Sequence, residues 1–263
     1  MEAKKIKDFV RKNYAKIAVN NSFCGCNTTS KSSCCSGSSI STEDISKRLG
    51  YTDKDLGSIP SGANLGLGCG NPLALAALKP GDVVLDLGSG AGFDCFLAVQ
   101  RVGETGKVIG VDMTPEMIKK AEGNAKRGGV KNVEFKLGEI EKLPVEDNSI
   151  DVIISNCVIN LSPDKQQVFK EAFRVLKPGG CIWVSDIVLL GKLPKVVKES
   201  MAAYASCVSG AVLKDKYLGF ITSAGFVDVK VEEETTAAIK HFVGKDIEGT
   251  VASIKVYGLK QRK

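Results

Sequence analysis

The sequence lacks any apolar run that approaches the ~20 residues of a membrane-spanning helix. Its first residues, Met1 to Asp8, are charged and lack the apolar stretch of a signal peptide. Hydrophobic residues make up 43% and charged residues 25%, both ordinary values for a globular protein. We therefore expect a cytoplasmic protein that has no membrane partner.

Aromatic residues are scarce, at 6%, and they are not interleaved with the basic residues. The formal charge of +6 arises largely at the two ends of the chain. A nucleic-acid or membrane contact is one interpretation of such charge. Without aromatic partners for bases, a solvated helix face and a solvated tail explain it better, and we expect no nucleic-acid partner.

Disulfide pairing is not expected, because nine cysteines are an odd number and no export signal is apparent. Four of them lie in a loop rich in serine and glycine: Cys24, Cys26, Cys34 and Cys35. A zinc site is one alternative, but the gaps of one and zero residues fit structural zinc spacing badly. A mobile thiol relay is favoured, and no metal cofactor is expected.

Hydrophobic periodicity predicts strands that alternate with helices. A first segment, 1–70, holds an amphipathic helix over 2–19, the cysteine-rich loop and a short helix over 43–49. A core over 71–190 follows, and 191–263 completes the sheet. Strands are expected at 83–87, 108–111, 133–137, 150–155, 181–185, 227–232 and 252–259. One helix is expected from the end of the glycine loop to residue 102. The others are expected at 72–78, 115–126, 165–176, 195–207 and 214–224. Such βαβ units imply an α/β fold, a mostly parallel sheet with helices on both faces.

A glycine-rich loop joins the first of these core strands to the next helix, in Asp86-Leu87-Gly88-Ser89-Gly90-Ala91-Gly92. Glycines permit close approach of the backbone to a ligand, and the helix N-terminus favours a negative group. An ordinary turn and a dinucleotide site are the alternatives. The spacing is Gly-x-Gly-x-Gly, whereas nicotinamide binders carry Gly-x-Gly-x-x-Gly.

An acidic residue, Asp112, ends the second strand, where a carboxylate can accept hydrogen bonds from two ribose hydroxyls. Together with the glycine loop, it resembles the signature of the Rossmann-like class I methyltransferases, over about residues 71–190. This resemblance implies S-adenosylmethionine as methyl donor. It also implies a set of cofactor-binding residues, some of them after the third and fourth strands: Asp86, Gly88, Gly90, Gly92, Asp112, Met113, Glu139, Ile140 and Asn156.

The segment after the fourth strand indicates the methyl acceptor, because ligands bind at the carboxyl ends of parallel strands. It reads Ser155-Asn156-Cys157-Val158-Ile159-Asn160-Leu161 and is unlike the Asn-Pro-Pro-Tyr segment of many amino-group methyltransferases. The single histidine, His241, lies far from the predicted site, and no other general base is obvious. An acceptor that needs no deprotonation fits best. Trivalent arsenic keeps a lone pair and is a soft centre that prefers thiolates.

The chain resembles the arsenite methyltransferases over about residues 51–230. The matching segments are 62–72, 92–95, 155–161 and 206–210. The resemblance implies that Cys69, Cys157 and Cys207 hold arsenite and then methylarsenite, and that an N-terminal cysteine serves redox turnover. It leaves open which of the four N-terminal cysteines does so. The chain ends sooner after its last strand than longer family members do.

Two further cysteines have simpler explanations. Cys95 lies in the first helical turn after the glycine loop, where the dipole could lower a thiol pKa, but packing is preferred. Cys181 begins the fifth strand at the end opposite the site and is expected to be structural. Cys34 and Cys35 are the predicted redox thiols, with thioredoxin or a glutathione-type reductant as partner.

Two other functions stay open from the sequence. One is a small-molecule methyltransferase that acts on carbon or oxygen and whose cysteines are incidental. The other is a metalloid-binding protein without turnover. The glycine loop and Asp112 argue against the second, because sequestration needs no cofactor pocket.

Overall fold

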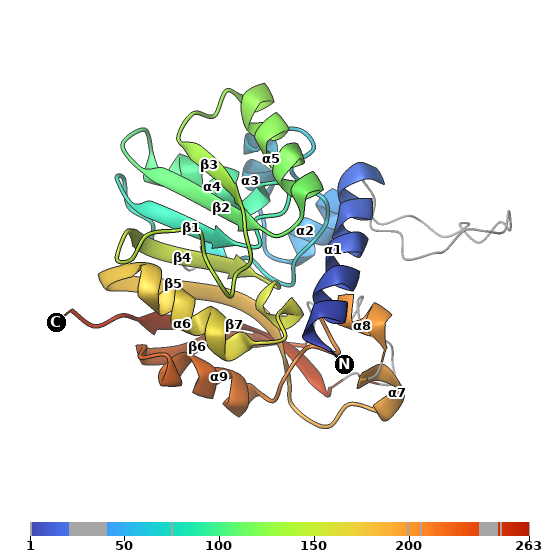
Figure 1. The fold of residues 1–263 in the computed structure, drawn as a ribbon. Coiled ribbons are helices and arrows are strands. Elements are labelled where there is room, and N and C mark those ends of the chain that lie inside the picture. Colours follow the sequence, from blue (N-terminus) through green and yellow to red (C-terminus); the bar gives the residue numbers. More distant parts are fainter. Residues whose placement is uncertain are drawn as a thin grey trace, which may run out of the picture.

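A seven-stranded sheet forms the centre of the chain (Figure 1). The computed structural model describes residues 2–20, 41–74, 76–198, 200–205, 207–236, 247 and 249–262. The strand order is β3-β2-β1-β4-β5-β7-β6. The strands are β1 Val83–Leu87, β2 Lys107–Asp112, β3 Val133–Leu137, β4 Ile150–Asn156, β5 Leu176–Leu189, β6 Val227–Thr235 and β7 Val251–Leu259.

The first five strands pair in parallel, and β7 pairs antiparallel with both β5 and β6. This arrangement confirms the predicted α/β fold. β5 is much longer than the expected 181–185, because it stays paired with β7 from Cys181 opposite Leu259 to Leu189 opposite Val251. Continuous pairing with a long neighbour satisfies its backbone groups beyond the parallel region.

Helices cover both faces of the sheet, in front and behind in Figure 1. The longer helices are α1 Ala3–Asn20, α4 Phe93–Val102, α5 Pro115–Gly128, α6 Lys165–Val175 and α9 Lys214–Ser223. The shorter ones are α2 Thr42–Arg48, α3 Asp53–Ser58, α7 Lys195–Lys198 and α8 Met201–Ala205, with 3₁₀ turns η1 Pro72–Ala74 and η2 Ile159–Leu161.

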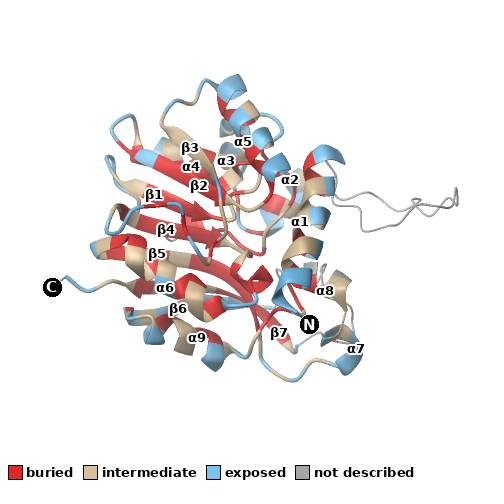
Figure 2. Cartoon of the chain, in the orientation of Figure 1, coloured by how far each residue is buried: buried red, intermediate tan, exposed pale blue. Residues whose placement is uncertain are grey.

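Alternate residues of β1 show why both faces must be covered. Leu85 packs in the apolar cluster with α6 and α9, whereas Val84 packs in the cluster with α4 and η1. Both side chains are fully buried, and Figure 2 shows the central strands as the most buried part of the molecule. Successive residues of a strand point to opposite faces, so each face needs its own helical layer.

Two of the predicted helices are wrong in extent. The helix expected over 72–78 is only η1, because the Leu73 carbonyl accepts a hydrogen bond from the Arg101 side chain instead of continuing a helical ladder. The helix expected over 195–207 is interrupted between α7 and α8. Ser200 Oγ accepts from the Ala203 N–H at 3.2 Å and so starts a separate helix.

The short helix α3 was not predicted, although its start is visible in the sequence. Thr52 and Asp55 form a capping box, in which Thr52 Oγ1 accepts from the Asp55 N–H at 3.1 Å. The same device starts α2, where Ser41 and Asp44 are the pair.

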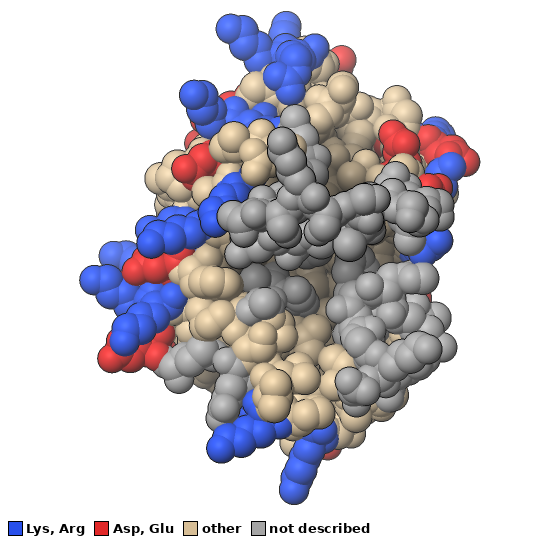
Figure 3. All heavy atoms as spheres, turned by 90° about the vertical axis from the view of Figure 1, so that its right-hand side faces the viewer, with Lys and Arg blue, Asp and Glu red and all other residues tan. Residues whose placement is uncertain are grey.

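The described part of the chain contains no helix that is both long and apolar enough to cross a membrane. On the face shown in Figure 3, Lys and Arg side chains stand around the edge, with Asp and Glu side chains among some of them. On α1, Lys7 and Arg11 pair with acidic side chains of another loop. Among the described residues on the face in Figure 3, the Lys and Arg side chains stand in separate groups.

Candidate functional site

One cavity lies at the carboxyl ends of the parallel strands, beside α1. It is lined by residues of α1, of the 63–69 segment, and of the segments that follow β1, β2, β3 and β4. Figure 1 shows α1 lying across the edge of the sheet to which these strands point. Loops after neighbouring parallel strands converge at this edge, so residues far apart in the sequence share one space.

The glycine loop after β1 forms one wall. The N–H groups of Gly88 and Ser89 both donate to the Val111 carbonyl, at 2.8 and 3.0 Å, which ties the loop to β2. Gly88 has φ +71°, and a Cβ there would overlap the Val158 side chain. Gly88 and Gly90 line the cavity, whereas Gly92 lies just outside it, at the start of α4.

Asp112, at the end of β2, lines the cavity beside the glycine loop. Its Oδ2 accepts from the Gly90 N–H at 3.0 Å, and its Oδ1 accepts from the Thr114 N–H at 2.8 Å. Burial raises the pKa of this carboxyl above its ordinary value, although the backbone donors oppose the shift. Met113 lines the cavity next to it.

Two further carboxyls, Asp86 and Asp94, lie at the cavity wall and are buried. Burial raises the pKa of Asp86 well above its usual value and raises the pKa of Asp94 to about 6. Asp86 Oδ2 accepts from Cys95 Sγ at 3.2 Å. Cys95 is therefore a buried thiol that bonds a carboxyl, and burial raises its pKa well above the ordinary value.

The segment after β3 closes the cavity together with α1. Ile140 and Glu141 line it, whereas Glu139, which was predicted to bind the cofactor, is not among the lining residues. Lys7 Nζ lies 2.9 Å from carboxylate oxygens of both Glu139 and Glu141. These ion pairs hold α1 against the segment after β3.

Three thiols meet at the inner end of the cavity: Cys69, Cys157 and Cys207. Cys157 follows β4, Cys69 belongs to the glycine-rich segment before η1, and Cys207 follows α8. Cys207 Sγ donates to the Cys157 carbonyl at 2.8 Å. All three side chains are buried, so the three cysteines that the sequence singled out for arsenic are brought together.

Backbone strain accompanies two of these thiols. Cys157 and Cys207 have φ of +59° and +64°, a region that non-glycine residues seldom adopt and that is enriched at functional sites. The Cys157 N–H donates to the Ser185 carbonyl at 2.7 Å, which holds its backbone in place. The surrounding structure therefore enforces the conformation that brings the two side chains together.

Two of the thiols, Cys69 and Cys157, have raised pKa values. Hydrogen bonds to Cys207 and Cys69 raise the pKa of Cys157 well above its ordinary value, and burial adds to the shift. Burial raises the pKa of Cys69. We therefore expect Cys69 and Cys157 to react slowly with solvent oxidants and to keep their protons until a ligand arrives.

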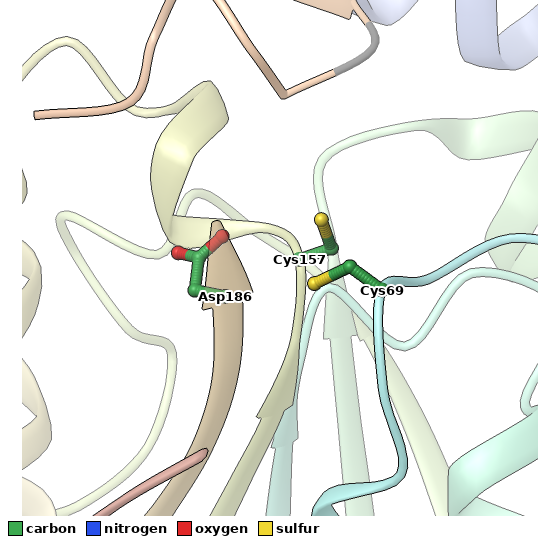
Figure 4. A group of neighbouring side chains, drawn as sticks. All are labelled: Cys69, Cys157 and Asp186. Atoms are coloured by element: carbon green, nitrogen blue, oxygen red, sulfur yellow. The ribbon is translucent and has the colours of Figure 1, made fainter. Parts of the chain in front are cut away.

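The buried carboxyl of Asp186 was missed from the sequence. Its oxygen and the sulfurs of Cys69 and Cys157 all lie within 4.8 Å of one another, and Figure 4 shows the three side chains as a group. Burial raises the pKa of Asp186 to about 7. Its position directly after the expected end of the fifth strand was the available signal, since that edge carries the site.

Asn156 also lines the cavity, but its side chain turns toward the Cys69 segment. Its Oδ1 accepts from the Cys69 N–H at 3.0 Å. Cys181 is half-buried on β5 and is not a lining residue. The predicted redox residues Cys34 and Cys35, together with Cys24, Cys26 and His241, lie outside the described residues.

The chain is similar to known methyl-transfer proteins. Residues 78–225 match a family described as a methyltransferase domain. An arsenite methyltransferase of Halobacterium salinarum is 48% identical over 239 residues, 89% of this chain and 61% of that protein. The human arsenite methyltransferase is 36% identical over 65% of this chain and 48% of its own length.

A solved structure extends the likeness. An arsenic (III) S-adenosylmethionine methyltransferase from Chlamydomonas reinhardtii is 33% identical, with a TM-score of 0.62, over 86% of this chain and 75% of that chain. The present chain spans between about half and three-fifths of the length of the two curated relatives.

Proposed function

Because this chain belongs to the arsenite methyltransferase family of S-adenosylmethionine-dependent methyltransferases, we propose that it methylates trivalent arsenic held by Cys69, Cys157 and Cys207. The convergence of these thiols at the inner end of the cavity is the observation that carries the proposal. Arsenite and then methylarsenite are the substrates. Soft sulfur ligands suit trivalent arsenic, and hard oxygen ligands do not.

The lining residues fit S-adenosylmethionine as the donor. Asp112 accepts from one backbone N–H on each oxygen, and its carboxylate lines the cavity, where it can also accept from ribose hydroxyls. Gly88 and Gly90 permit a close approach of the ligand to the backbone. When bound, the cofactor supplies an electrophilic methyl group on a cationic sulfur, and the buried carboxyls Asp86 and Asp94 provide a compatible electrostatic environment.

The raised pKa values of Cys69 and Cys157 suit the binding step. Each arsenic–oxygen bond of arsenite that breaks releases hydroxide, and each thiol that forms an arsenic–sulfur bond gives up one proton, so the pair leaves as water. Burial raises the pKa of Cys69, and hydrogen bonds chiefly raise that of Cys157, so that these protons stay on sulfur until exchange occurs. No separate general base is then required.

Methyl transfer uses the arsenic lone pair. The arsenic–carbon bond forms as the sulfur–methyl bond breaks, and arsenic changes formally from trivalent to pentavalent. Two thiolates that join as a disulfide return two electrons and restore trivalent methylarsenic. Cys34 or Cys35, paired with Cys69, is our candidate for this step, and an external thiol such as thioredoxin or glutathione reopens the bond by exchange.

Methyl transfer to arsenite in the presence of a thiol reductant tests the proposal. The wild-type chain should form methylarsenicals. Cys157→Ser, which keeps the shape but supplies a hard oxygen, should lower the rate sharply. Cys181→Ser is the matched control, because Cys181 is outside the cavity lining, and it should stay active.

Three results would count against the proposal. Full activity in Cys157→Ser would remove this thiol from the site. Arsenite binding without methyl transfer would indicate sequestration. Transfer to a carbon or oxygen acceptor, with arsenite inactive, would indicate another small-molecule methyltransferase.

A further inference from the structure

A single side-chain amide joins two of the three thiol-bearing segments. Asn156 Oδ1 accepts from the Cys69 N–H at 3.0 Å, and its Nδ2 donates to the Gly70 carbonyl at 2.8 Å. The amide thereby binds the backbone of two consecutive residues, Cys69 and Gly70. Asn156 also directly precedes Cys157 in the chain, so its orientation bears on the spacing of the two thiols.

Tyr51 and Asp94 reinforce the orientation that the Cys69 N–H and the Gly70 carbonyl give this amide. The Tyr51 hydroxyl has one proton and donates it to Asp94 Oδ1 at 2.7 Å; the Gly70 carbonyl is farther away, at 3.3 Å. The oxygen of the Tyr51 hydroxyl then accepts from Asn156 Nδ2 at 3.0 Å. Asp94 Oδ2 lies 3.2 Å from the same nitrogen and also accepts from it. Both partners offer acceptors to Asn156, so the NH₂ end must face them and the carbonyl end must face Cys69.

The Cys69 segment is packed tightly on this amide. Gly68 has φ +110°, and a Cβ there would stand 2.7 Å from Asn156 Nδ2. A Cβ on Gly70 would overlap Ser185 Oγ. With so little room on either side, a rotation of the Asn156 amide requires the Cys69 segment to move as well.

Tyr51 is itself firmly held, although it lies before the residues that match the methyltransferase family. Its side chain is 3% exposed, and its ring meets that of Phe93 edge-on at 4.6 Å between centroids. A buried phenol whose oxygen both donates and accepts is able to fix the polarity of its neighbours.

We infer that Tyr51 is a positioning residue for arsenic binding: with Asp94 it orients the Asn156 amide, which holds Cys69 beside Cys157. This inference rests on the proposed function. It adds a residue of the N-terminal segment to the acceptor site and gives Asn156 a role toward the thiols.

Tyr51→Phe tests the inference, because it removes the hydroxyl and keeps the buried ring. The affinity for arsenite, measured by equilibrium dialysis, should fall about tenfold, equivalent to ~1.4 kcal/mol. The affinity for S-adenosylmethionine should stay within about twofold. Tyr257→Phe is the matched control: Tyr257 is half-buried on β7, beside Trp183 and outside the cavity lining, and neither affinity should change.

A double-mutant cycle separates positioning from general destabilisation. If Tyr51 acts through Cys69, Tyr51→Phe should have no further effect on arsenite affinity in a Cys69→Ser background. The same tenfold loss in both backgrounds, or unchanged affinity in the single variant, would overturn the inference.

A readout without arsenic keeps this test independent of the proposed function. Hydrogen exchange of the Cys69 amide should become about tenfold faster in Tyr51→Phe, because the Asn156 amide that accepts from it loses one of its partners and is held less firmly. Unchanged exchange at this amide would refute the positioning role. A wild-type chain that binds no arsenite would count against the proposed function, and the exchange result would still decide the role of Tyr51.

Discussion

Replacement of Asp112 by alanine is the most direct test of the cofactor wall. The carboxylate has about four acceptor positions, and the Gly90 and Thr114 N–H groups take one on each oxygen, at 3.0 and 2.8 Å. The carboxylate also lines the cavity, where a ligand hydroxyl can reach it. We expect Asp112→Ala to weaken S-adenosylmethionine binding by about 1–3 kcal/mol, or roughly 5- to 150-fold.

The same substitution leaves two backbone donors without their carboxylate, so a loss of stability must be separated from a loss of binding. Asp151→Ala supplies the comparison. Asp151 lies at the start of β4, outside the cavity lining. Like Asp112, it accepts from a backbone N–H, that of Val83, at 2.9 Å, and it also forms an ion pair with Lys177. Both variants should unfold more readily than the wild type, but only Asp112→Ala should bind the cofactor more weakly.

Titration calorimetry with S-adenosylmethionine, run beside urea unfolding of each protein, measures the two effects separately. A dissociation constant of Asp112→Ala equal to that of the wild type would show that no ligand hydroxyl is bonded there. Equal weakening in Asp151→Ala would show that the effect is a general loss of stability.

Three other predictions concern redox turnover, loop geometry and pH. The double variant Cys34→Ser/Cys35→Ser should bind arsenite normally but stall after the first round; unchanged multiple-turnover product formation would exclude this relay. Gly68→Ala should lower the free energy of unfolding by about 1–3 kcal/mol, because its φ is +110°. Gly219→Ala, inside α9 with open space around it, should raise that free energy by about 0.5–1 kcal/mol, and urea unfolding that gave the two variants the same sign would contradict the argument. Burial raises the pKa of Asp186 from 3.8 to about 7. Between these pH values the folded state keeps a proton that the unfolded chain loses, so this group lowers the free energy of unfolding as the pH rises. Asp186→Asn should remove that slope, up to about 1.4 kcal/mol per pH unit, and parallel stability–pH curves of variant and wild type would refute it.

The sequence by itself determined the sheet and the cavity wall that Gly88, Gly90 and Asp112 form. Val83–Leu87 is a mostly buried, nearly continuous apolar run, and the half-buried Val133–Leu137 is an alternating run; both lie between turn residues, and their pattern reflects local geometry. The glycine loop and Asp112 are likewise defined by short spacings along the chain. Cys157 could be placed at the carboxyl ends of the parallel strands, where ligands bind, because a residue that directly follows a strand has little freedom in its position.

Tertiary structure decided the rest, because those features depend on contacts between distant segments. Cys69 and Cys207 reach Cys157 only through the path of two loops, and the break between α7 and α8 depends on a serine cap that the apolar pattern does not show. Tyr51 meets Asn156 across 105 positions of sequence. Residues so far apart carry no common period or spacing, so only the folded chain brings their polar atoms together.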